Sequence, residues 1–71
     1  MNIDRFEGIM EAHISTWEAV MDARKRDLEA VEDSYEKGLI EGSIVTIRMV
    51  LDDLRKALER EKERARERAK A

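Results

Sequence analysis

His13 is the single histidine of the chain and the first residue to consider for metal chemistry. A zinc site needs about four ligands, so His13 would have to meet a second copy of itself together with carboxylates such as Glu7 or Glu11. The Glu-x-x-His pattern of di-iron bundles is absent, because Met10 stands three residues before His13. We therefore expect no metal ligand here, only a histidine hydrogen-bonded locally at the edge of an apolar seam.

Catalytic groups are equally sparse. Ser15, Ser34 and Ser43 stand at positions typical of helix caps or turns, outside any nucleophile motif, and the chain has no cysteine. Gly38 and Gly42 lack the Lys-Ser/Thr that completes a phosphate-binding loop. The sequence predicts no catalytic residue, no cofactor-binding residue and no enzymatic activity.

Composition favours long helices. The 71 residues include no proline, three glycines and 44% charged residues, with a net charge of −3. Proline is the strongest helix breaker, so its absence over this length indicates uninterrupted helix. A negative net charge argues against nucleic acid as a partner, and no apolar run is long enough to cross a membrane. The lack of cysteine favours a reducing, cytoplasmic location.

Apolar residues recur at three- and four-residue intervals, the pattern of helices that pack on helices. In the first half they fall on lines of seven, one of which runs Ile14, Met21, Leu28, Tyr35. Asn2 or Asp4 can cap this first helix. The predicted core of the second helix comprises Ile44, Val45, Ile47, Val50, Leu51, Leu54 and Leu58.

The second apolar stripe is out of phase with the first, so a bend between them is expected. Gly38 suits a helix C-terminus and Ser43 suits an N-cap. We predict an all-α antiparallel helical hairpin, as one domain over 1–71. Its helix one covers about 3–37, its turn 38–43, and its helix two about 44–69, with a charged solvated end at 59–71.

Two other arrangements agree with the same pattern. One continuous helix could carry both stripes on opposed faces. Alternatively, Ser15 and Glu18 have capping-box spacing, so a break there would give three helices over roughly 3–13, 16–37 and 44–69.

The charged end alternates acids and bases three residues apart, which predicts intrahelical ion pairs. Interleaved glutamates oppose phosphate binding, yet the arginines leave open a nucleic-acid-associated regulator as an alternative function.

A hairpin folded about Leu39 would set Leu58 opposite Val20 and leave the start of helix one facing charge. Soluble monomers seldom expose such a contiguous apolar patch. The predicted interface residues are Ile3, Phe6, Ile9, Met10, His13, Ile14 and Trp17. We expect a non-enzymatic interaction module that forms a homodimeric four-helix bundle and docks on a further protein of unknown identity. A purely structural or designed bundle is the remaining alternative.

Overall fold

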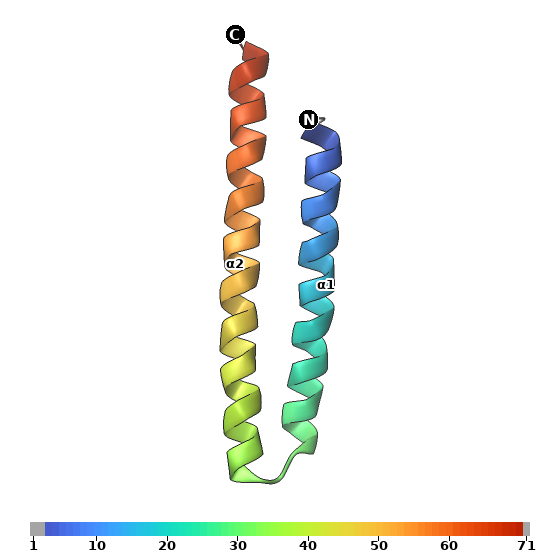
Figure 1. The fold of residues 1–71 in the computed structure, drawn as a ribbon, viewed down its shortest axis with the longest axis vertical. Coiled ribbons are helices and arrows are strands. Elements are labelled where there is room, and N and C mark those ends of the chain that lie inside the picture. The colour runs from blue at the N-terminus through green and yellow to red at the C-terminus, as the bar shows by residue number, and fades with distance from the viewer. Residues whose placement is uncertain (1–2, 71) are drawn as a thin grey trace.

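The chain folds as two antiparallel helices joined by a short turn (Figure 1). The computed structural model describes the backbone of residues 3–70 and the side chains of residues 5–70. Helix α1 runs Ile3–Ala30 and helix α2 runs Ser34–Lys70, and the described part of the chain contains no strand. This confirms the all-α helical hairpin and excludes one continuous helix. The molecule is a rod of 57 × 15 × 15 Å.

The position of the turn differs from the prediction. Helix one ends at Ala30 rather than near residue 37, and the chain reverses over residues 31–33 rather than 38–43. Tyr35 continues the heptad line of Leu28, but it lies beyond the turn and is 74% exposed. The predicted end of the second helix, near residue 69, agrees with the observed end at Lys70.

Asp33 caps the start of α2. Its carboxylate accepts a hydrogen bond of 3.0 Å from the Glu36 backbone N–H, and its carbonyl accepts one of 2.9 Å from the Lys37 N–H. Asp at the N-cap followed by Glu three residues later resembles the capping box, which satisfies amides that have no partner within the helix. The sequence contains this signal, although Gly38 and Ser43 predict a turn further along the chain.

The two glycines that suggested a turn lie inside α2 instead. Neither Gly38 nor Gly42 has a positive φ, the conformation that would end a helix there. A glycine inside a helix costs only about 1 kcal/mol relative to alanine, which a packed helix tolerates. Ser43 does not cap, because its hydroxyl donates to the Ile40 carbonyl at 2.9 Å within the helix.

The alternative with a break near Ser15 is also wrong. Helix α1 continues through Gly8 and Ser15. The adjacent Thr16 hydroxyl donates to the Ala12 carbonyl at 2.9 Å, as a hydroxyl within a helix commonly does. The proposed cap at Asn2 lies outside the described residues, as does the side chain of Asp4.

Moving the turn changes which residues face each other. Leu58 and Phe6 are equally far along the chain from Glu32, so Leu58 comes near the level of Phe6 rather than Val20. Helix α2 therefore covers α1 over most of its length and extends beyond its N-terminal end (Figure 1). The apolar residues at the start of α1 now meet apolar residues of α2, whereas a turn at 38–43 would have set them against charge.

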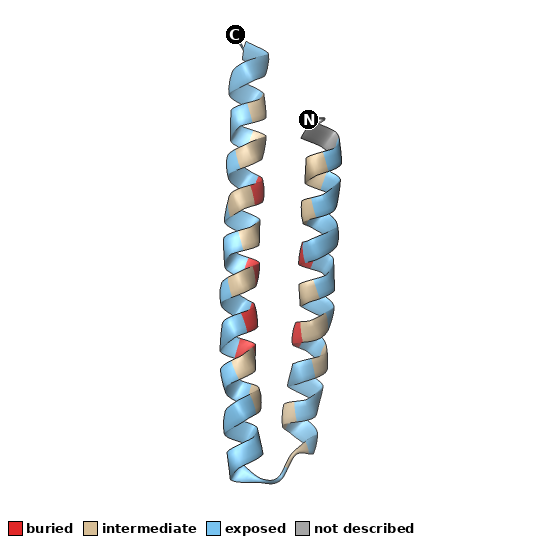
Figure 2. Ribbon diagram, viewed as in Figure 1, coloured by how far each residue is buried: buried red, intermediate tan, exposed pale blue. Residues whose placement is uncertain are grey.

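The core is a single narrow seam. The buried side chains are Ile14, Met21, Ile44, Ile47, Leu51 and Leu58. They line the inner sides of the two helices, while the outer sides are exposed (Figure 2). Even these keep some solvent contact, and among the described residues no large side chain is fully buried. Two cylinders touch along a line, so they cannot enclose side chains on every side.

Leu51 is 4% exposed, so its replacement by alanine is expected to be among the costliest single changes. Loss of a buried leucine side chain typically destabilises by about 2–5 kcal/mol. We expect Leu51→Ala to lose most helical circular dichroism at 25 °C. Glu29→Ala, at an exposed site of α1 outside the seam, should unfold like the original chain. Equal effects of the two changes would contradict the assignment of the core.

Asp33→Ala removes the side-chain cap of α2 and is expected to lower the free energy of unfolding by about 1 kcal/mol. Asp53→Ala is the matched control, because Asp53 is an exposed aspartate within the same helix. Urea unfolding at one fixed protein concentration measures both. A turn at 38–43 would instead make the two variants alike.

Candidate functional site: an apolar face shared by both helices

The two flanks of α1 differ sharply in chemistry. With 100° of rotation per residue, Trp17 and Val20 are turned from Met21 by about 40° and 100° in one direction. Lys25 and Glu18 are turned by about 40° and 60° in the other. Trp17 and Val20 are half-buried and pack against the core, whereas Glu18 and Lys25 are exposed. One flank of α1 is therefore apolar and the other charged.

Helix α2 repeats this division. From Leu51, Leu54 and Val50 are turned by about 60° and 100° in one direction, and Arg55 and Arg48 by about 40° and 60° in the other. Leu54 and Val50 are half-buried, and the two arginines are exposed. The apolar flank again lies opposite the charged flank.

The charged flanks of the two helices lie on the same side of the hairpin. Five charged side chains from both helices line one shallow groove there, beside Met21 and Leu51: Glu18, Asp22, Lys25, Arg48 and Arg55. An ion pair of 3.7 Å between Arg55 and Glu18 crosses it. Both partners are about half exposed, so solvent screens the pair and its contribution to stability is small. Since the charged flanks share one side, the apolar flanks share the other.

We call this second side the apolar face. It comprises Phe6, Ile9, His13, Trp17 and Val20 from α1, with Val50, Leu54 and Ala57 from α2. Most of these side chains are half-buried, while Ile9 is 49% exposed and His13 is exposed. One side of each half-buried residue rests on the seam and the other side meets water. The face therefore offers a broad apolar surface built from both helices.

The seven residues predicted as an interface are divided by the structure. Ile14 belongs to the intramolecular core, so the prediction that this stretch remains uncovered is wrong for Ile14. Met10 and Trp17 pack partly against that core, and Phe6 is half-buried. The physical reason is the turn at 31–33, which brings the apolar part of α2 opposite them. The side chain of Ile3 lies outside the described residues.

The contribution of α2 to the apolar face was missed. Val50 and Leu54 are predicted from the sequence to be core residues, and no role is predicted for Ala57. The signal was present in their spacing, since Val50, Leu54 and Ala57 form a line beside the core line of Ile47 and Leu51. The side of the hairpin on which this line lies depends on how the two helices pair.

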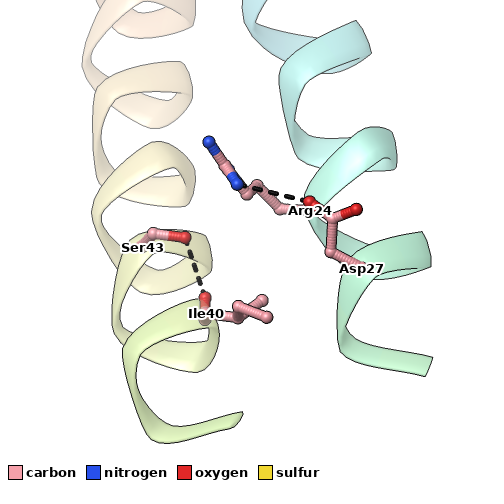
Figure 3. A network of polar contacts seen from close by, with 4 residues as sticks. All are labelled: Arg24, Asp27, Ile40 and Ser43. Carbon is pink, nitrogen blue, oxygen red and sulfur yellow. Dashed lines mark hydrogen bonds and ion pairs between the residues drawn. The ribbon is translucent and has the colours of Figure 1, made fainter. Parts of the chain in front are cut away.

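Arg24 and Asp27 lie on α1 between Val20 and the loop at residues 31–33, and their side chains contact each other (Figure 3). The Arg24 guanidinium donates to the Asp27 carboxylate at 3.2 Å, which satisfies two charges that the sequence places on the apolar side. Figure 3 shows the pair beside Ile40 and Ser43, which lie within helix α2. Arg24 and Asp27 therefore lie between the apolar face and the loop at residues 31–33.

The charged end of α2 is held by its own ion pairs. Arg64 pairs with Glu61, and Arg66 pairs with Glu63 at 2.6 Å. The hydrogen bond to Glu63 raises the pKa of Arg66, so its charge persists and is engaged within the helix. Such pairs neutralise bases that a phosphate backbone would require.

No group of three or more potential metal ligands occurs among the described residues, whether around His13 or elsewhere. Neither α1 nor α2, over the residues described, is both long and apolar enough to cross a bilayer. Comparison of the chain with protein-family models, with curated proteins and with solved structures finds no match. The apolar face is thus the feature from which a function can be argued.

The ion pair between Glu18 and Arg55 tests the alignment of the helices. Arg55→Glu sets two carboxylates side by side and is expected to reduce the free energy of unfolding by up to about 1 kcal/mol. Adding Glu18→Arg restores an opposite-charge pair and should recover that loss in low-salt buffer. Failure of the second change to compensate for the first would contradict the observed pairing.

Proposed function

We propose that this chain is a non-enzymatic association module that forms a homodimer through the apolar face. Two hairpins joined along this face make an antiparallel four-helix bundle, in which each chain completes the core of the other. The observation that carries the proposal is the division of the hairpin into one charged and one apolar side, each formed by both helices.

The surface area of the chain supports the proposal. The chain exposes 5564 Å². A compact monomer of 8.3 kDa is expected to expose about 4600 Å², so the hairpin has an excess of about 1000 Å². A standard dimer interface removes about 800 Å² from each partner. One interface of ordinary size therefore brings the exposed area per chain into the usual range.

The residue types of the face also suit a permanent contact. Phe6 and Trp17 are large aromatic side chains with one side already fixed against the hairpin. Buried aromatic anchors dominate the energy of most interfaces, and a side chain that is already ordered loses less entropy on binding. With the apolar faces joined, the charged grooves point outward on both sides of the bundle and keep it hydrated.

A homodimer follows from symmetry. A two-fold contact sets the same face against itself, so one elongated apolar face can cover its own copy. The resulting bundle presents two identical charged sides, each bearing Glu18, Asp22, Lys25, Arg48 and Arg55. These sides are the surfaces on which a further protein would dock.

Ile9→Glu is expected to abolish association through the apolar face at 10–50 μM, because it places a charge in the joined apolar faces. Ile9 is 49% exposed within one chain, so the change spares the hairpin core. Sedimentation equilibrium gives the molar mass. Val45→Glu is the matched control, since Val45 is 53% exposed on the opposite side of α2 and should leave this dimer intact.

Trp17 offers an independent measurement on the same samples. Its indole is half-buried in one chain and becomes fully buried in the bundle, so its fluorescence should shift to shorter wavelength as the dimer forms. A stably folded monomer at these concentrations, with concentration-independent fluorescence, would refute the proposal.

A further inference from the structure

The outward side of α2 carries a second apolar surface, separate from the apolar face. Four of the most exposed large apolar side chains lie within residues 35–49: Tyr35, Leu39, Val45 and Met49, at 74%, 59%, 53% and 63% exposed. A helix that meets water on one side normally carries polar residues there. This part of α2 instead carries apolar residues on its outer side as well as on its inner side.

Glycines lie between these side chains. Tyr35, Gly38, Gly42, Val45 and Met49 are turned by about 120–200° from Leu51, so they form one line that we call the outer stripe. The space over Gly38 and Gly42 is open, since a Cβ added at either position would meet nothing within 4 Å. Glycine lets a second helix approach closely, and Val45 and Met49 project beside the hollow.

We propose that the outer stripe binds the outer stripe of a second copy, with the two α2 helices antiparallel about a two-fold axis between Ser43 and Ile44. In this arrangement Val45 of one chain lies over Gly42 of the other, and Met49 lies over Gly38. Large residues of each chain then fill the hollows over both glycines of the other. A two-fold contact makes each such pairing twice.

Charge complementarity favours this orientation. The same axis brings Tyr35 of each chain level with Asp52 of the other, so the tyrosine hydroxyl can donate to a carboxylate. It also brings Lys56, which pairs with Asp52 of its own chain at 2.8 Å, beside the turn of the other chain, where Glu32 and Asp33 are exposed. A parallel pairing would instead set Asp52 against Asp52 and one acidic turn against the other, which costs energy.

This contact lies on the side of α2 away from α1 and does not use the apolar face. A chain with two separate two-fold contacts assembles beyond the dimer. The inference therefore adds a second self-interface to the proposed module, and its truth does not depend on the first.

The chain has no cysteine, so one introduced thiol reports one position. In the proposed pairing the two copies of residue 45 are separated along the helix axis by about 4.5 Å, and those of residue 35 by about 25 Å. In a glutathione redox buffer, Val45→Cys is expected to form a disulfide-linked dimer at least tenfold faster than Tyr35→Cys. Equal rates, or no Val45→Cys dimer, would overturn the proposal.

The experiment is repeated with Ile9→Glu added, which separates the two interfaces. The disulfide at position 45 should form at an unchanged rate even where the apolar-face dimer is lost. If it disappears together with that dimer, the outer stripe is not an independent contact.

Gly38→Gln tests the close approach of the helices. Added to Val45→Cys, it is expected to slow disulfide formation at least tenfold, because its side chain occupies the place of Met49 from the other copy. Gly8→Gln is the control, since Gly8 lies in α1 and is equally open. An undiminished rate with Gly38→Gln would overturn the proposed packing of large residues over glycine.

Discussion

The hydrogen bond from the Glu36 amide to the Asp33 carboxylate marks where α2 begins, and the alignment of the whole hairpin follows from that point. With the chain reversing over residues 31–33, the core residues Ile14 and Met21 lie alongside Ile44 and Leu51. A shift of the turn toward the glycines would have set the apolar start of α1 against the charged end of α2. The cap contributes about 1 kcal/mol, and it acts together with the larger gain from matching the two apolar stripes.

The same alignment explains why the hairpin is incomplete by itself. Two helices in contact bury one line of side chains, and residues beside that line remain half covered. On one side of the seam these neighbours are charged and pair across it, as Glu18 and Arg55 do. On the other side they are Phe6, Trp17 and Leu54, whose free surfaces gain from contact with another apolar surface. Because only one side of the seam is apolar, association through that side is favoured.

Helix α2 exposes more large apolar side chains than α1 does. Between Tyr35 and Leu51 it carries apolar residues on its inner and its outer side, and one partner helix covers only the inner side. A segment of this kind is normally found in the middle of an assembly. The glycines at 38 and 42 are consistent with that position, because they cost helical stability and are open in the single chain.

The sequence by itself determined that the chain is helical and which residues are apolar at three-four spacing. These properties are local, since they depend on the absence of proline and on 3.6 residues per turn. The place of the reversal could not be obtained in this way. Asp33 with Glu36, Ser15 with Glu18, and the glycines at 38 and 42 are competing signals, each worth about 1 kcal/mol.

Only the packing of α1 on α2 selects among these signals, because the sum of many buried contacts exceeds any single cap. The sides of the hairpin depend on that choice as well. Whether Val50 and Leu54 join the face of Trp17 follows from the antiparallel pairing, which brings the apolar flanks of both helices to one side. For that reason the apolar character of the candidate site could be predicted from the sequence, but the residues that α2 contributes to it could not.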